Sequence, residues 1–191
     1  MAVIGKHNVT NDTPSNILLG AGTYHRGLRF SGNAWSGTPF GATSGGGKIS
    51  IKGEYVVLDV DGALVKFKGQ TVKQGGTAVA EINFTEINPE TLKLGTLFKE
   101  GTTDAEGYVM LEDKAHIEEG DYIENFGFVG KTADGTKNIV VIFENALCTS
   151  GLEIEAKNKE QSVVKLTLEA IASNEGDLDT LPVKIYYPTG A

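Results

Sequence analysis

The sequence predicts a mainly β fold, a β-sandwich or barrel-like domain with one short flanking α-helix, a long loop and an N-terminal arm. Several segments alternate apolar and polar residues with a period of two, which is typical of strands with one face on a core. Glycine is abundant, at 25 of 191 residues, and proline is scarce, at 5, a mixture that suits short strands and tight turns. The length is sufficient for one domain, and we expect residues 1–191 to form it.

The N-terminal quarter has the least regular pattern. Residues 1–15 are polar and predict an extended N-terminal arm, and residues 17–24 predict a short strand interrupted by glycines. Residues 31–47 are rich in glycine and do not alternate, so they predict a long loop, and loops of this length are usually functional or disordered. Trp35 and Phe40 lie in this loop, and we expect them to contact a partner because exposed aromatic residues often mark interfaces.

The clearest strand signals follow this loop. Residues 48–60 predict one strand, and Asp61 and Gly62 then provide a tight hairpin turn, since such dipeptides tolerate positive φ angles. Residues 63–67 alternate again and predict the return strand.

A second turn signal, Gly75-Gly76, precedes a strand over residues 77–85. One face of this strand is apolar, and it carries Ala78, Ala80, Ile82 and Phe84. The opposite face is mainly polar, and it carries Glu81, Asn83 and Thr85. The sequence therefore predicts a sheet with one face on the core and the other in solvent.

One convincing helix follows. Asn88 can cap its N-terminus, and Pro89 suits the first helical position because its missing N–H would have no intrahelical partner. Ile87 and Leu92 are spaced as a hydrophobic staple. The helix has only about two turns, so it must pack against the sheet to be stable.

The second half of the chain returns to strands, and the run over residues 139–143 is apolar on both faces, which predicts a central position. The expected strands are residues 108–111, 122–129, 139–143, 152–156, 164–170 and 183–187.

Composition and charge narrow the classes of function. The net charge of −8 argues against a protein that binds DNA through its phosphates, because such binding requires clustered Lys and Arg. Residues 1–52 hold five basic groups and one acidic group, whereas residues 81–124 hold twelve acidic groups and three lysines. Complementary charge sets partner choice, so one region is expected to meet the other in a neighbouring subunit, with scattered solvated charge as the alternative.

The cysteine, hydropathy and motif content points away from catalysis and membranes. Cys148 is the single cysteine and follows an apolar strand, so we expect a packed thiol in a protein made in a reducing cytoplasm. No apolar run has the length of a membrane span, so no membrane association is expected. The three histidines are far apart and form no metal-binding motif, and no nucleophile or phosphate-binding motif is present. We therefore expect no enzyme activity, no cofactor and no metal.

Patterns across most of the chain resemble the major tail tube proteins of long-tailed, non-contractile bacteriophages. The segments that carry this resemblance are residues 17–24 (ILLGAGTY), 41–52 (GATSGGGKISIK), 54–69 (EYVVLDVDGALVKFKG), 77–97, 163–170, 177–182 (DLDTLP) and 185–188 (IYYP). Residues 99–135 do not contribute to it.

The resemblance implies a structural virion protein that assembles into stacked, hexameric rings and forms a hollow tube in the phage tail. Its partners would be copies of itself, the tape measure protein, and the tail tip and terminator proteins, while phage DNA would pass through without specific binding. Such proteins are made in the host bacterial cytoplasm and reside in the virion. Within this frame, Glu81, Asn83 and Thr85 are expected to face the lumen, and residues 1–15 and 31–47, with Trp35 and Phe40, to join successive rings.

Two other readings remain open. The chain could be the tube protein of a contractile tail or of a secretion system, which would share the fold. It could also be a β-sandwich module for carbohydrate binding or adhesion, which would need an exposed aromatic platform.

Overall fold

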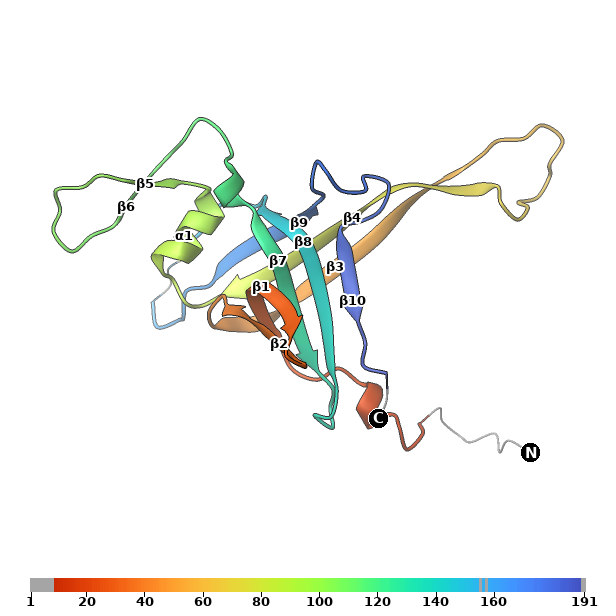
Figure 1. Ribbon diagram of the computed structural model, residues 1–191, viewed down its shortest axis with the longest axis horizontal. Helices are drawn as coiled ribbons and strands as arrows, with labels where there is room; N and C mark the ends of the chain where they lie inside the picture. Colours follow the sequence, from red (N-terminus) through yellow and green to blue (C-terminus); the bar gives the residue numbers. More distant parts are fainter. Residues whose placement is uncertain (1–8, 155, 157, 190–191) are drawn as a thin grey trace.

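The protein consists of one large antiparallel sheet, from which the β3–β4 hairpin and the segment with the small β5–β6 sheet project on opposite sides (Figure 1). We describe it from a computed structural model, which covers residues 9–154, 156 and 158–189 in detail. The strands are β1 (Thr23–Ser31), β2 (Ala34–Pro39), β3 (Thr43–Val57), β4 (Thr71–Phe84), β5 (Lys99–Gly101), β6 (Met110–Glu112), β7 (Ile123–Lys131), β8 (Asn138–Cys148), β9 (Val164–Ile171) and β10 (Val183–Tyr186). The helices are α1 (Pro89–Thr96) and the short 3-10 turns η1 (Pro14–Asn16) and η2 (Glu119–Asp121).

The large sheet has eight strands in the order β2-β1-β7-β8-β9-β4-β3, and β10 pairs with β8 beside this path. β8 is therefore the branch point: its first half pairs with β10 and its second half with β9. The edge strands β2 and β3 follow one another in the chain, so the sheet must curl to bring them together at one end. They do not pair within the described residues, so the predicted mainly β fold is confirmed, but the barrel is not closed.

Two apolar clusters lie on opposite faces of the β7–β8 pair. The larger is built around Phe84, Phe126 and Phe143. The smaller contains Leu28, Val140 and Ile142, with half-buried Trp35 and Val129 packed on it. Because consecutive strand residues point to opposite faces, Ile142 and Phe143 enter different clusters. This confirms the predicted central position of residues 139–143.

The hairpin predicted at Asp61-Gly62, with a return strand at residues 63–67, is wrong. β3 and β4 form a single long hairpin whose ladder runs from Thr43 opposite Phe84 to Val57 opposite Thr71. Asp61 and Gly62 do form a turn, with φ of +82° at Gly62, but no return strand follows at residues 63–67. The Gly75-Gly76 pair lies inside β4 and not at a turn, next to an irregularity opposite Glu54 and Tyr55.

The long loop predicted at residues 31–47 is also wrong. β1 turns at Gly32-Asn33, both with positive φ, and returns as β2. Two such residues between antiparallel strands are the signature of a type I′ hairpin turn, which matches the twist of the strands. β3 then begins at Thr43, so most of this segment is paired sheet.

The helix agrees with the prediction. The Asn88 side chain accepts a hydrogen bond from the Thr91 backbone N–H at 2.8 Å, and Pro89 occupies the first position. The helix ends where Leu97 adopts a left-handed conformation, with φ of +58°. Leu94 is buried against the larger cluster, which is the tertiary support that a two-turn helix needs.

The remaining predicted strands are present, but some of them are shorter than expected. Residues 108–111 are reduced to β6, and among the described residues of 152–156 Ile154 makes an isolated bridge, to Val164. The strands expected at 122–129, 164–170 and 183–187 correspond to β7, β9 and β10. Of the N-terminal arm expected at residues 1–15, residues 1–8 lie outside the described residues, and η1 begins at Pro14.

Candidate assembly surface

The outer face of β4 carries the residues expected to face a lumen. Glu81 and Asn83 point away from the core, because their neighbours Ile82 and Phe84 are fully buried on the other side. Thr85 directly follows the strand and is half-buried, and its hydroxyl donates to the Ala42 carbonyl at 3.3 Å. None of the three is buried in the monomer core.

Glu81 is held between two lysines from neighbouring strands. Its carboxylate lies 3.0 Å from Lys48 Nζ on β3 and 3.6 Å from Lys165 Nζ on β9. The hydrogen bond from Lys48, followed by the charges of both lysines, lowers the pKa of Glu81 below its ordinary value. The three side chains form a cross-strand row in solvent, where each pair contributes little to stability but fixes the local charge pattern.

This face of β3, β4 and β9 is balanced in charge. The ladder register places three lysines and three glutamates on it, namely Lys48, Lys52, Lys165, Glu54, Glu81 and Glu169. The protein as a whole carries −8, so the acidic character lies elsewhere. A surface with interleaved charges of both signs offers no extended basic strip to a phosphate backbone.

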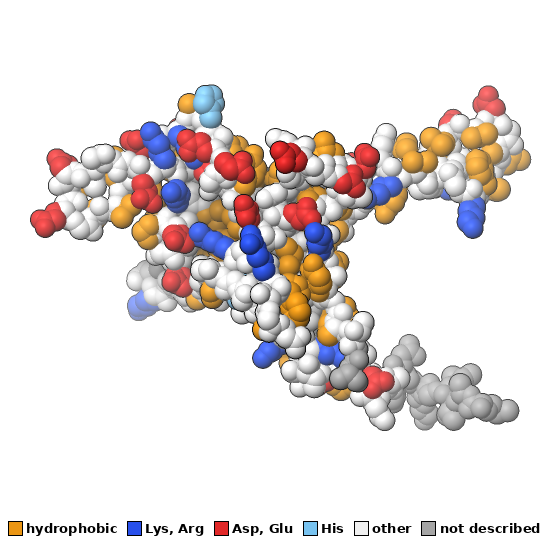
Figure 2. Space-filling model, viewed as in Figure 1, with side chains coloured by type: hydrophobic (Ala, Val, Ile, Leu, Met, Phe, Trp, Pro, Cys, Tyr) orange, Lys and Arg blue, Asp and Glu red, His pale blue; other side chains and the backbone are white. Residues whose placement is uncertain are grey.

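The β3–β4 hairpin projects far beyond the core, and its end exposes apolar side chains (Figure 1, right). We call residues 58–70 the tip. Leu64 is 98% exposed and Val65 79% exposed, and Leu58, Val60 and Phe67 are also exposed. Figure 2 shows these hydrophobic side chains gathered at the outer end, with acidic groups on one side and basic groups on the other. A contiguous exposed apolar patch of this kind marks an interaction site.

The tip has internal order of its own. Gln70 is only 7% exposed, and its amide donates to the Leu58 carbonyl at 2.7 Å. The Gln70 side-chain oxygen accepts from the Phe67 backbone N–H at 3.2 Å, and the Leu58 N–H donates to the Gln70 carbonyl at 2.9 Å. These bonds close the base of the loop, so less conformational entropy remains to be lost when the tip meets a partner.

The two aromatic residues predicted to join rings do not lie on a free loop. Phe40 is 6% exposed and packs in the larger cluster, with its ring centroid 5.8 Å from that of Phe126 and 6.0 Å from that of Phe84. The Arg26 guanidinium lies 4.7 Å from its ring centroid and covers the remaining side. The prediction of a surface contact for Phe40 is therefore wrong, because Phe40 closes the end of the curled sheet.

Trp35 is half-buried on β2 in an aromatic cluster. Its ring lies 5.2 Å from that of Phe30 and 4.8 Å from that of Tyr186, both at steep interplanar angles. Phe30 and Tyr186 keep much of their surface exposed. These rings meet edge to face, so they do not form the flat platform that a sugar-binding module would present.

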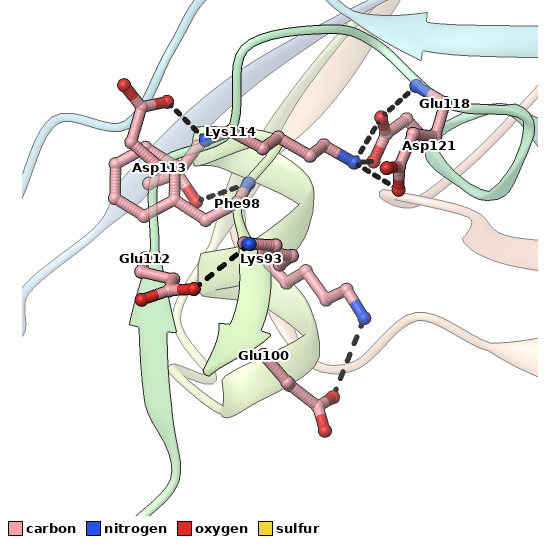
Figure 3. A network of polar contacts seen from close by, with 10 residues as sticks. Lys93, Phe98, Glu100, Glu112, Asp113, Lys114, Glu118 and Asp121 are labelled. Carbon is pink, nitrogen blue, oxygen red and sulfur yellow. Dashed lines mark hydrogen bonds and ion pairs between the residues drawn. The ribbon is translucent and has the colours of Figure 1, made fainter. Parts of the chain in front are cut away.

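A second projection spans residues 99–121 and contains the β5–β6 hairpin (Figure 1, left). Its return to the sheet is anchored by Lys114, whose side chain is 9% exposed. Lys114 Nζ lies 2.6 Å from Asp121 Oδ2 and 3.3 Å from Glu118 Oε2, as Figure 3 shows. The hydrogen bond that Lys114 donates to the Asp121 carboxylate is the main cause that raises the pKa of Lys114, so the ammonium stays charged.

A cavity of about 610 Å³ lies between α1, β7 and this projection. Its apolar part is formed by Pro89, Leu94, Leu97 and Ile123. Five carboxylates line it, and four of them are ion-paired: Glu90 with Arg26, Glu100 with Lys93, Asp121 with Lys114 and Glu124 with Arg29, while Glu119 is the fifth. We call it the acidic cavity. The sequence showed the acidic excess of this region, but not that it would gather around an apolar hollow.

Nothing in the described part of the chain forms a group of three or more residues able to hold a metal ion. Cys148 is buried at the end of β8, as expected for a packed thiol. Across those same residues, no helix has the length and apolar character required to span a bilayer.

The chain matches no protein-family model and no curated protein sequence.

Proposed function

We propose that this protein is a structural subunit that assembles with copies of itself into stacked rings, forming the hollow tail tube of a long-tailed bacteriophage. In this proposal the rings are hexameric, the tape measure, tail tip and terminator proteins are further partners, and DNA passes through without specific binding. The subunit would be made in the host cytoplasm and would end in the virion.

The observation that carries the proposal is the projecting β3–β4 hairpin with its unpartnered apolar tip. Burying those side chains requires another molecule, because the tip extends away from the core of its own chain (Figure 1). A two-stranded hairpin without a further covering surface is only marginally stable in water, so contact with another copy would stabilise the projecting part.

Open sheet edges support the same proposal. Among the described residues β3 pairs only with β4, and β2 only with β1, so each leaves one edge unpaired. β3 alone contributes 15 residues to such an edge. Long exposed edges are templates for pairing with another chain, so a ring of subunits can complete a larger sheet.

The charge-balanced face of β3, β4 and β9 supports a lumen lined by Glu81, Asn83 and Thr85. Paired charges on this face leave little net field toward a passing polyanion. DNA can then slide along the wall, because phosphate binding depends on an excess of Lys and Arg.

Negative-stain electron microscopy of the purified protein tests the proposal directly. We expect stacked rings or hollow rods that lengthen with protein concentration. A protein that stays monomeric at high concentration, even with tail tip proteins as initiators, or that binds glycans instead, would contradict it. Co-assembly with a contractile sheath would favour a contractile tail tube.

A further inference from the structure

Three glycines meet in the β3–β4 hairpin, close to the point where it leaves the sheet. Gly53 lies opposite Gly76, and Gly75 is next along β4, opposite Glu54. The register then shifts by one residue, so Gln74 is left outside the ladder as a β-bulge. Cross-strand side-chain pairs stabilise a sheet, and neither of these two rungs has a side chain on both strands. Resistance to bending is therefore low at this point.

The part of the hairpin beyond the bulge is independent of the core. β4 pairs with β9 only from Val79 inward, so the hairpin is two-stranded outside that residue. Across residues 55–73 the one buried side chain is Gln70, which is enclosed within the tip. The Tyr55 ring folds over Gly53 but remains 67% exposed. A change of angle at the bulge therefore removes no side chain of the outer hairpin from the core.

The loop between β9 and β10, residues 172–182, lies against the hairpin at this point (Figure 1, dark blue). A Cβ at Gly76 would lie 3.0 Å from Leu181 Cδ1, so the absence of a side chain allows this close approach. Leu181 is half-buried, and the adjacent Pro182 carbonyl accepts a hydrogen bond from the Glu144 N–H of β8 at 2.9 Å. The main sheet thus holds Leu181 against the inner side of the bulge.

The same loop also acts on the outer side of the bulge. The Asp177 carboxylate accepts hydrogen bonds from the Asp179 N–H and the Thr180 hydroxyl, both at 2.9 Å, and these bonds order the loop. They lower the pKa of Asp177, and the positive charge of Lys73 adds to this effect. Lys73 is the first residue of β4 beyond the bulge to pair with β3. The loop therefore restrains the hairpin on both sides of the glycines.

We propose that the glycine bulge is a hinge about which the outer hairpin, residues 55–73, turns as a unit, and that the loop of residues 172–182 is a strut that sets its angle. Hinges are short segments that absorb backbone rotation while the parts on either side stay rigid. The hydrogen bonds of Gln70 supply that rigidity in the tip. The inference goes beyond the proposed function, because it concerns the single chain and holds whether or not the chain forms tubes.

Double electron–electron resonance measures the spread of hairpin angles. Nitroxide labels on Lys68→Cys and Lys131→Cys report the distance from the tip to β7, and labels on Lys52→Cys and Lys131→Cys report it for the inner hairpin. The three lysines are exposed and Cys148 is buried, so labels attach at the intended sites. At a protein concentration below that of assembly, we expect a broad distance distribution for the tip pair and a narrow one for the inner pair.

Two substitutions change the hinge and the strut separately. A Cβ at Gly75 would lie 3.6 Å from its nearest neighbour, Glu54 Oε2, so Gly75→Val should fit, stiffen the strand and narrow the tip distribution. Leu181→Ala removes the strut contact and should shift the mean distance and increase the variance about twofold, because losing one of two comparable restraints halves the stiffness. Thr77→Val on β4 and Leu178→Ala, at a side chain that is 70% exposed, are the matched controls and should change neither.

Amide hydrogen exchange of the unlabelled wild type covers the case in which a variant fails to fold. The hydrogen-bonded amides of residues 53–54 and 73–76 should exchange faster than those of ladder residues 55–57 and 77–84 on either side. Equal or slower exchange there would overturn the inference. So would a tip distribution as narrow as the inner one, or a folded Gly75→Val or Leu181→Ala variant that leaves the tip distribution unchanged. None of these results depends on assembly, so each leaves the proposed function to its own test.

Discussion

Replacing Phe40 with alanine separates a core role from an interface role. The sequence alone suggests an exposed aromatic residue in a loop, whereas the structure packs Phe40 between Phe84 and Phe126 under the Arg26 guanidinium. An interface residue would leave the monomer stable when truncated. A core residue would not, so the free energy of unfolding decides between them.

The expected loss is large. Phe40 is 6% exposed, so Phe40→Ala removes an almost fully buried ring and leaves a cavity among rings that cannot collapse freely. Substitutions of this kind cost about 3–5 kcal/mol. For a chain of 191 residues, each kcal/mol lowers the melting temperature by roughly 2–4 °C, so we expect a decrease of about 6–20 °C.

Urea and thermal unfolding followed by circular dichroism measure this at a protein concentration below that of assembly. Leu64→Ala is the matched control, because Leu64 is 98% exposed and its truncation should change stability by less than about 0.5 kcal/mol. The reasoning fails if Phe40→Ala unfolds within about 1 kcal/mol of the wild type. Loss of assembly without loss of stability would instead place Phe40 at an interface.

Three further changes test other parts of the fold. Asn88→Ala removes the N-terminal cap of α1 and should lower the free energy of unfolding in urea by about 1 kcal/mol, whereas Asn88→Asp should retain most of the wild-type stability. Gly47→Ala places a methyl group against the Tyr24 hydroxyl and should destabilise by about 1–3 kcal/mol, while the same change at the open position Gly120 should not. Lys48 lowers the pKa of Glu81 in the folded protein. The ionised carboxylate therefore contributes to folding stability above its ordinary pKa of 4.5, and this contribution is lost as the pH falls through the lower pKa of the folded state. The wild type should therefore lose more stability between pH 6 and pH 3 than Glu81→Gln, and equal losses would contradict this.

Part of the candidate surface follows from sequence periodicity. Alternation along residues 77–85 places Glu81 and Asn83 opposite Ile82 and Phe84, and the structure agrees. The pairing of Glu81 with Lys48 and Lys165 could not be predicted from the sequence, because the register of the ladder is set by contacts between strands far apart in the chain. The run Leu64-Val65 is the local signal of the apolar tip, but the alternation over residues 63–67 predicts a return strand there.

The glycine-rich segments show where local signals mislead. Gly32-Asn33 carries a hairpin signal that glycine content over residues 31–47 obscured. Gly75 and Gly76 resemble a turn, yet both lie within the β4 ladder, where cross-strand hydrogen bonds outweigh their weak preference for strands. Neighbouring strands therefore decided the conformation of both segments.

The sequence by itself determined the β class, the apolar and polar faces of individual strands and the capped helix, because these depend on residues a few positions apart. Only the tertiary structure decided that Phe40 is core, that β3 and β4 form one projecting hairpin, and that acidic residues surround an apolar cavity beside α1. These features depend on which distant segments meet. The free energy of burial acts on the whole chain, so no local pattern records it.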